Sequence, residues 1–325
     1  MEWLRFKTAL AGIVTTGLMA SAPSVHAQSF PASGKPITII VPYAAGGVTD
    51  TTARMMAAGL ERELKTTVQV VNKVGAASQV GLTELVRSNP DGYTLSYAVL
   101  PTVTTHYLDP SRQAIYTRDN FQPVAMHHVT VMMLAVKADA PYKTLKDLVA
   151  AAKDKPGTIK ISDSGLMAVP HTAVLMLERA ANVKFASVHF GGGAPSVTAL
   201  LGGHVDVLSG STADSLPHVK SGAFRVLGVS GDKPDRTMPE VPTMTSQGFD
   251  VQIASWAGIV APAKTPKNVL DALTQGIKRV VESPEHSAKL SDFGVAPAYL
   301  SPDEYGKLWA DIENRMRPLL ADLKK

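Results

Sequence analysis

The chain has 325 residues and a formal net charge of +4, with 32 Lys and Arg residues against 28 Asp and Glu residues. This mild charge is spread along the chain without a basic block, which argues against nucleic acid as a partner. The sequence contains no cysteine, so the fold must be stabilised by hydrophobic cores rather than by disulfide bonds. A chain of this length can bury two cores, and missing disulfides are more typical of a bacterial periplasmic protein than of a small extracellular domain.

Residues 1–27 have the features of a secretory signal peptide. Two basic residues precede an apolar stretch at 8–20, and Val25 and Ala27 stand at positions −3 and −1 of a cleavage site. No later segment reaches the roughly 18 uninterrupted apolar residues that a membrane-spanning helix needs. We therefore expect a soluble mature protein that begins at residue 28 and is exported to the periplasm.

Short β-branched runs then alternate with amphipathic helical patterns. Residues 36–43, 68–72 and 93–99 are predicted strands, with one helix capped by Thr49 or Asp50 and another at 78–87. Repeated strand–helix–strand units indicate a parallel sheet with helices on both faces.

The same pattern restarts further along the chain. Predicted strands at 129–136, 158–164, 185–190, 205–210 and 224–230 alternate with predicted helices at 144–154, 170–181 and 196–201, and two long helices follow at 266–282 and 302–323. The sequence thus predicts an α/β protein of two lobes, each a mostly parallel sheet flanked by helices. We expect residues 28–128 plus 254–325 to form the first lobe and residues 129–253 the second, with crossovers near 126–137 and 250–262.

The sequence offers no catalytic or metal-binding motif. It has no G-x-S-x-G elbow, no G-x-x-x-x-G-K-[ST] phosphate loop, no H-E-x-x-H and no cysteine cluster. His127 and His128 are adjacent, so on a strand they should point to opposite faces and cannot bind one metal ion together. We interpret both as ordinary surface or hinge histidines, and we expect neither a metal ion nor a cofactor.

Four turns rich in small residues follow predicted strands. They are "YAAGGVTD" (43–50), "KVGAAS" (73–78), "SDSGLMA" (162–168) and "FGGGAP" (190–195). Ligands bind at this edge of open α/β sheets, and each turn opens a helix whose free N–H groups favour an anion. Lys73 is the one cation in these turns, so backbone N–H and hydroxyl groups should hold most of the charge. His171 follows the third turn and is either a ligand contact or a packing or capping residue.

These motifs resemble the periplasmic solute-binding proteins of tripartite tricarboxylate transporters, called Bug or TctC-like proteins. The family pattern P-[FY]-x-x-G-G-x-x-D-x-x-A-R is matched by residues 42–54, N-x-x-G-A by 72–76, P-D-G-Y-T-L by 90–95, L-L-G-G-x-V-D by 200–206, and W-x-G-x-x-x-P-x-x-T-P by 256–266. A turn with Ser162 or Ser164, Gly165 and His171 matches a further family segment. The matches run in order along the mature chain.

The resemblance implies a two-lobed, Venus-flytrap type of binding protein that closes over a small carboxylate and delivers it to a two-subunit membrane permease. We expect a monomer that binds no nucleic acid. The residues implied to bind the ligand are Tyr43, Ala45, Gly46, Gly47, Thr49, Asp50, Gly75, Ala76, Ala77 and Ser78 in the first lobe, and Ser162, Ser164, Gly165, Met167, Ala168, His171, Phe190, Gly191, Gly192 and Asp206 in the second.

Departures from the family pattern bear on the ligand. Leu166, Met167 and Val169 stand where small residues are common, and Phe190-Gly191 replaces a Tyr-Lys or Tyr-Arg pair. The added apolar surface favours a mono- or dicarboxylate with an aromatic or aliphatic body over citrate or an amino acid. Two other functions stay open: an extracytoplasmic sensor that presents its ligand to a membrane kinase and, with less support, an enzyme that acts on a carboxylate.

Overall fold

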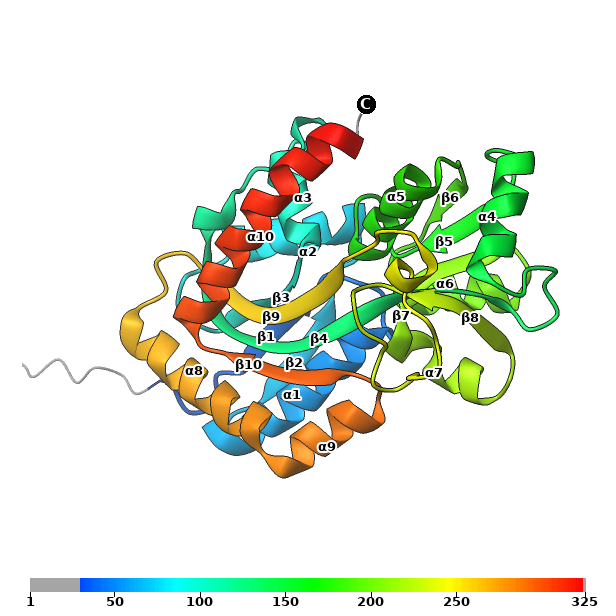
Figure 1. Cartoon of the computed structure of the whole chain (residues 1–325). Helices are drawn as coiled ribbons and strands as arrows, with labels where there is room; N and C mark the ends of the chain where they lie inside the picture. The colour runs from blue at the N-terminus through cyan, green and yellow to red at the C-terminus, as the bar shows by residue number, and fades with distance from the viewer. Residues whose placement is uncertain (1–29, 324–325) are drawn as a thin grey trace, which may run out of the picture.

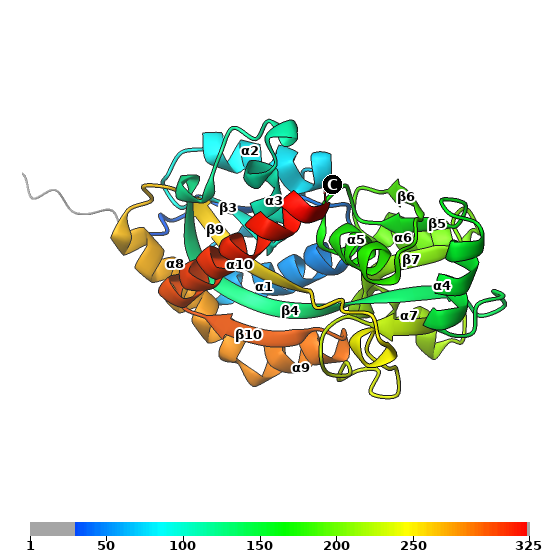
Figure 2. The same cartoon turned by 45° about the horizontal axis from the view of Figure 1, so that its top comes forward.

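The computed structural model describes residues 30–323, and the predicted signal peptide lies outside this range. The protein has an α/β fold in which ten strands form one curled, mixed sheet. Figure 1 shows two masses of helices and strands that share the long strand β4 (Phe121–Lys137), and Figure 2 shows the same arrangement from a second angle. We call these masses the first and the second lobe.

The first lobe contains five further strands and six α-helices. Its strands are β1 (Ile37–Val41), β2 (Val68–Asn72), β3 (Thr94–Leu100), β9 (Ala254–Pro262) and β10 (Ala296–Leu300). One face of this sheet is covered by α1 (Val48–Leu64), α8 (Lys267–Glu282) and α9 (Pro284–Asp292), and the other by α2 (Gln79–Arg87), α3 (Thr102–Leu108) and α10 (Pro302–Leu323). Three short 3₁₀ turns also belong to this lobe: η1 (Ala76–Ser78), η2 (Pro110–Arg112) and η3 (Arg118–Asn120).

Burial explains the nearly continuous apolar run of β1. Ile37 and Ile39 belong to the core under α1 and α8, whereas Ile40 belongs to the core under α2. A central parallel strand is covered on both faces, so its side chains are apolar in both directions.

The second lobe is built on four strands beside the far half of β4. They are β5 (Lys160–Asp163), β6 (Ala186–His189), β7 (Val207–Ser211) and β8 (Phe224–Val229). The helices α4 (Leu145–Asp154) and α5 (Val169–Ala181) pack on one face, and α6 (Gly193–Leu201) and α7 (Thr212–Lys220) on the other. The 3₁₀ turn η4 (Thr245–Gln247) lies in the segment that leads to β9.

Each lobe combines parallel and antiparallel pairs. β1 is parallel to β2 and β3, and β5 is parallel to β6 and β7, as the strand–helix–strand units predict. β4 is antiparallel to β9 and β10 in the first lobe and to β7 and β8 in the second. The chain crosses between the lobes inside β4, because residues up to Val131 pair with β9 and residues from Met132 onward pair with β7. The predicted strand at 129–136 covers only the second half of β4.

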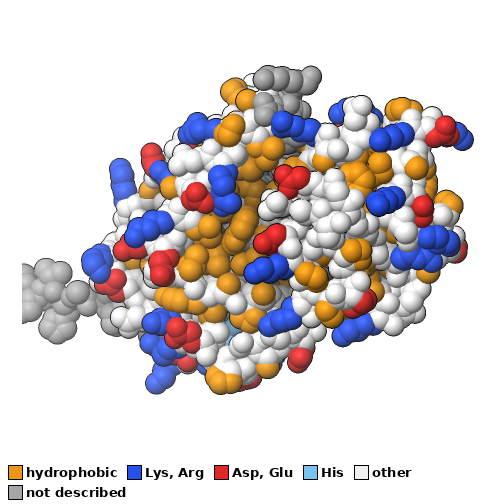
Figure 3. All heavy atoms as spheres, in the orientation of Figure 1, with side chains coloured by type: hydrophobic (Ala, Val, Ile, Leu, Met, Phe, Trp, Pro, Cys, Tyr) orange, Lys and Arg blue, Asp and Glu red, His pale blue; other side chains and the backbone are white. Residues whose placement is uncertain are grey.

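The surface is mixed in character. Figure 3 shows positive and negative side chains interspersed on one face, with hydrophobic side chains gathered between α10 and the second lobe. Within residues 30–323, no helix combines the length and the apolar character that a membrane span requires.

Candidate ligand-binding site

A cavity of about 60 Å³ lies between the lobes, at the carboxyl ends of the parallel strands. Its wall is formed by the turns after β1, β3, β5 and β7, by the start of α6 and by the middle of β4. It has room for on the order of four water molecules, which suits a small polar solute between closed lobes. The position agrees with the rule that places ligands at this edge of α/β sheets.

The wall is rich in hydroxyl groups. Nine of its residues carry one: Tyr43, Thr49, Thr102, Thr130, Ser164, Ser196, Ser209, Ser211 and Ser255. No Lys or Arg from the described range contributes to the wall. Burial lowers the pKa of His128, also on the wall, to about 3, so its ring is neutral at physiological pH. An anion in this cavity would therefore be held by N–H and hydroxyl donors rather than by a side-chain cation.

Asp50 organises the turn between β1 and α1 from behind the cavity. Its Oδ2 accepts a hydrogen bond from the Gly46 N–H at 2.9 Å, and its carboxylate also accepts from Arg54 and Asn72. Burial raises the pKa of Asp50, but these hydrogen bonds outweigh burial and hold the pKa below its usual range. The residue thus stays ionised and orients the glycine turn. The predicted cap is wrong, because the N-cap of α1 is Gly47 and no side chain of its own turn caps this helix.

Asp214, from the second lobe, accepts a hydrogen bond from the N-terminus of α1. Its Oδ1 accepts from the Val48 N–H at 2.9 Å, and its Oδ2 accepts from the Ser211 hydroxyl at 2.9 Å. Although part of its surface is accessible, burial raises the pKa of Asp214 to about 6 in spite of the hydrogen bonds from Ser211 and Val48. Asp214 is the one carboxylate on the wall of the cavity among the described residues.

Further hydrogen bonds join the lobes around the cavity. Ala44 N donates to Gly191 O at 2.9 Å, and Val169 N donates to the Thr102 hydroxyl at 3.1 Å. Arg112 of the first lobe donates to Leu166 O of the second lobe and to Ala76 O of its own. The lobes are therefore in a closed arrangement.

Four of the predicted ligand-binding residues lie on the wall: Tyr43, Gly47, Thr49 and Ser164. The others lie outside it, and all but one fall into three groups. Ala45, Gly46 and Asp50 belong to the turn that Asp50 organises, while Gly75, Ala76, Ala77, Ser78, Gly165, Gly191 and Gly192 lie in turns where the lobes meet. Ser162, Met167, Ala168, His171 and Phe190 are buried or half-buried in the second lobe. Asp206 falls in none of these groups and is exposed.

The placement of Asp206 near the cleft is wrong. Asp206 immediately precedes β7, so it lies at the amino end of the strand, whereas the cavity lies at the carboxyl end. Its carboxylate accepts a hydrogen bond from Lys160 N at 2.8 Å, at the start of the neighbouring β5. The family motif marks a strand pairing here rather than a ligand contact.

The residues that suggested an apolar ligand body mostly lie elsewhere. Leu166 is exposed, Phe190 packs on the second-lobe core and Met167 packs on the first-lobe core, whereas Val169 alone of the four lies on the wall. The polar wall itself is therefore the better guide to the ligand.

The interpretation of His127 and His128 as surface histidines is wrong, whereas their position in β4 is close to the point where the chain crosses between the lobes. Both are buried, and their rings lie 4.8 Å apart. The register of β4 against β9 shifts between Met126 and His128, so His127 is an extra residue that breaks the alternation of faces. His127 Nδ1 lies 2.7 Å from the Tyr97 hydroxyl, and its Nε2 lies 2.8 Å from Nε2 of His286 on α9. A bulge cannot be anticipated from strand periodicity.

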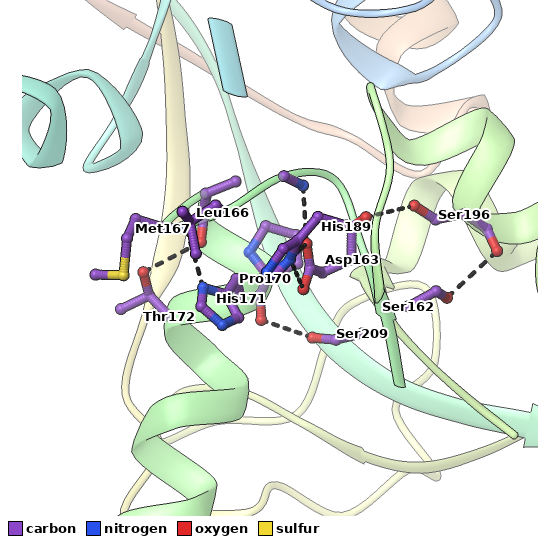
Figure 4. Close-up of polar contacts among 12 residues, drawn as sticks. Ser162, Asp163, Leu166, Met167, Pro170, His171, Thr172, His189, Ser196 and Ser209 are labelled. Carbon is purple, nitrogen blue, oxygen red and sulfur yellow. Dashed lines mark hydrogen bonds and ion pairs between the residues drawn. The ribbon is translucent and has the colours of Figure 1, made fainter. Parts of the chain in front are cut away.

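His171 braces the turn before α5 (Figure 4). Its Nδ1 accepts a hydrogen bond from Met167 N at 2.9 Å, and burial lowers its pKa. Beside it, Asp163 accepts from His189 Nδ1 and from Gly165 N. Ligand atoms of Asp163, His171 and His189 lie within 4.8 Å of one another. However, the Nδ1 lone pair of His171 is used and its neutral ring carries the proton on Nε2, so we interpret the cluster as a hydrogen-bonded brace rather than a metal site.

Sequence reasoning missed the contributions of β3, β7 and the middle of β4. Thr102 follows β3, Ser209 and Ser211 lie at the end of β7, and Asp214 lies in the first turn of α7. The stretch "SGSTAD" (209–214) is itself a small-residue turn after a strand, so the rule that found the other turns could have found it. His128 and Thr130 of β4 carry no comparable signal.

The fold and this cavity define a class: two α/β lobes that enclose a small solute between them. The family model described as tripartite tricarboxylate transporter family receptor matches residues 52–324, so the chain belongs to this family of solute-binding proteins.

Individual relatives agree with this family. A UPF0065 protein of Cupriavidus necator is 29% identical over 319 residues, which cover 96% of this chain and 94% of the relative. The structure of the periplasmic binding protein BugD is 27% identical with a TM-score of 0.83, covering 89% of this chain and 97% of that chain. MatC from Rhodopseudomonas palustris, solved with bound malate, is 25% identical with a TM-score of 0.82. The match covers 90% of this chain and 100% of the MatC chain.

Proposed function

We propose that the protein works as a monomer in the periplasm, where it captures a small carboxylate between its lobes and delivers it to the permease of a tripartite tricarboxylate transporter. The observation that carries this proposal is the cavity itself, whose wall includes nine hydroxyl-bearing residues and no Lys or Arg among its described residues. Such a wall stabilises a carboxylate through N–H and hydroxyl donors. A family of solute-binding receptors and a relative solved with malate support the same chemistry.

Among carboxylates, we favour aliphatic mono- or dicarboxylates over aromatic ones. The wall has apolar segments at Val99, Met132 and Val169, but hydroxyl groups predominate and the enclosed volume is small. The hydroxyl groups of such a wall match the carboxylates and polar groups of a short aliphatic chain better than the apolar faces of a benzoate ring.

A thermal-shift and calorimetric screen of malate, succinate, adipate, citrate and benzoate tests this function. Thr49→Val removes a hydroxyl from the wall, and Thr51→Val removes one from the outer side of the same helix turn. Because a hydrogen bond to a charged group contributes about 1.5–3 kcal/mol, Thr49→Val should weaken binding about tenfold or more while Thr51→Val leaves it unchanged. Absence of binding by every carboxylate would contradict the proposal. Uptake by cells that carry the matching permease, lost on deleting this chain, would separate delivery from capture.

A further inference from the structure

Asp214 is placed where the closing of the lobes changes its surroundings. It is the third residue of α7 in the second lobe, yet its Oδ1 accepts from Val48 N at the start of α1 in the first lobe. On its other side, a Cβ atom at Gly193 would lie 2.1 Å from Asp214 Oδ2. Parting the lobes removes the Val48 contact and exposes the carboxylate to water, whereas closing them covers it with backbone.

The same carboxylate lies on the wall of the cavity proposed to hold an anion. The wall offers no side-chain cation within the described residues, and its other titratable groups, Tyr43 and His128, are neutral. A ligand carboxylate in this space therefore brings a second negative charge close to Asp214. Two carboxylates that share a site without a cation cannot both ionise readily.

The elements packed around Asp214 carry few positive charges. On α7 itself these are His218 and Lys220 in the last turn of the helix, and Arg236, next to Asp235, donates to the Ser291 hydroxyl. α6 and β7 contain no titratable residue, and on α1 the guanidinium of Arg54 is bound to Asp50. Behind α7, Asp235 accepts from the Thr212 hydroxyl, and His286 of α9 is neutral because burial lowers its pKa to about 4. Lys289 of α9 pairs with its neighbour Glu285.

We infer that closing of the lobes over a carboxylate ligand is coupled to proton uptake by Asp214, so that the protein binds its ligand together with one proton. The inference rests on the proposed carboxylate-binding function and identifies Asp214 as the residue that makes that binding depend on pH. The proton comes from solvent and is carried on Oδ2. Neutral Asp214 keeps both contacts, because Oδ1 still accepts from Val48 N while the Oδ2–H donates to the Ser211 hydroxyl oxygen.

The expected direction follows from proton linkage. Burial raises the pKa of Asp214 to about 6 in the closed lobes, and a ligand carboxylate raises it further, whereas an exposed aspartate has a pKa of about 4. The closed, liganded form thus binds the proton more tightly than the open form, and affinity rises as pH falls. We expect binding about tenfold tighter at pH 5 than at pH 8.

Calorimetric titrations with malate and adipate at pH 5, 6, 7 and 8 test the coupling. Asp214→Asn imitates the neutral acid and should bind at pH 8 at least as tightly as the wild-type protein does at pH 5, because it needs no proton uptake. Ionisation of the ligand itself affects both proteins equally. The difference between their pH profiles therefore measures the contribution of Asp214 protonation to affinity. Asp206→Asn removes the same charge from the exposed amino end of β7 and should retain the wild-type profile. Parallel profiles for wild-type and Asp214→Asn, or weaker binding by Asp214→Asn at every pH, would overturn the inference.

Small-angle scattering without ligand separates this inference from the proposed function. The ligand-free wild-type protein should be more compact at pH 5 than at pH 8, and Asp214→Asn should be equally compact at both. This result would support the role of Asp214 even if no carboxylate binds, in which case only the proposed function fails. Wild-type dimensions that do not change with pH, or that change in parallel with those of Asp214→Asn, would contradict proton-coupled closing whatever the ligand proves to be.

Discussion

Gly193, the first residue of α6, has no room for a side chain. A Cβ atom there would meet the carboxylate of Asp214 at 2.1 Å and force it away from Val48 and Ser211. Overpacking of this kind costs about 1–3 kcal/mol, so Gly193→Ala should weaken ligand binding about tenfold. Titration calorimetry measures the loss. Gly306→Ala in α10 is the matched control, because its Cβ would meet only Pro123 at 3.8 Å. Equal affinities of both variants would show that the closed lobes tolerate a displaced Asp214.

The turn after β2 contains residues with a strained backbone. Ala76, Ala77 and Ser78 all have positive φ angles, of 47°, 53° and 86°. A left-handed residue other than glycine costs about 1 kcal/mol, and Ala76 is exposed, so Ala76→Gly should raise the free energy of unfolding by about 0.5–1 kcal/mol. The same substitution at the exposed Ala58, inside α1, should lower it by about 1 kcal/mol. Urea denaturation measures both, and a loss of stability in Ala76→Gly would mean that its methyl group makes a stabilising contact.

Among the elements, β4 and α9 share a buried histidine cluster that should make the protein sensitive to acid. Burial lowers the pKa of His127 well below its usual value, that of His128 to about 3 and that of His286 to about 4. The folded protein keeps these rings neutral, while the unfolded chain takes up protons from about pH 6.5 downward. Stability is therefore fully present above pH 6.5 and is lost as pH falls toward 4, by about 1.4 kcal/mol per pH unit for each ring that stays neutral.

Urea denaturation at pH 7.5, 6.5, 5.5 and 4.5 checks this expectation. His286→Gln removes one titrating ring and keeps a group that can accept from His127 Nε2, so its stability should fall less steeply below pH 6.5. His204→Gln changes an exposed histidine and serves as the control. A wild-type protein as stable at pH 4.5 as at pH 7.5 would contradict the assignment of neutral rings.

At the scale of elements, the sequence predicts those features of a strand or turn that depend on neighbouring residues alone. The apolar run of β1 and the glycine turn before α1 are visible in the sequence because a doubly covered strand needs apolar side chains and a close turn needs glycine. The first half of β4 and its bulge at His127 depend on pairing with β9, more than a hundred residues away in sequence, and leave no periodic signal. β10 depends in the same way on pairing with the distant β4.

At the scale of the molecule, the sequence predicts that the site lies at the carboxyl ends of the parallel strands. It does not predict which residues form the wall of the cavity. The four predicted turns all lie at the interface of the lobes, but most of their residues join the lobes while other side chains face the cavity. Which residues of a turn face inward depends on how the lobes are rotated about β4, and no single turn encodes that rotation. Asp214 is the clearest case, since its partner Val48 belongs to the other lobe.

Closure of the whole molecule should depend on Arg112, which connects the lobes outside the cavity. Its guanidinium donates to Leu166 O in the second lobe at 2.9 Å and to Ala76 O in the first at 2.6 Å. Arg112→Gln shortens the side chain and removes the charge. The bond to Leu166 O that joins the lobes is then lost, so the free energy of closing becomes less favourable by about 1–3 kcal/mol. Because Arg112 does not line the cavity, the ligand should still enter at the wild-type rate and leave about five- to a hundredfold faster.

Stopped-flow kinetics with the best carboxylate from the screen measures both rates, with Arg87→Gln on the exposed side of α2 as the control. A slower association with unchanged dissociation would instead assign Arg112 to ligand entry.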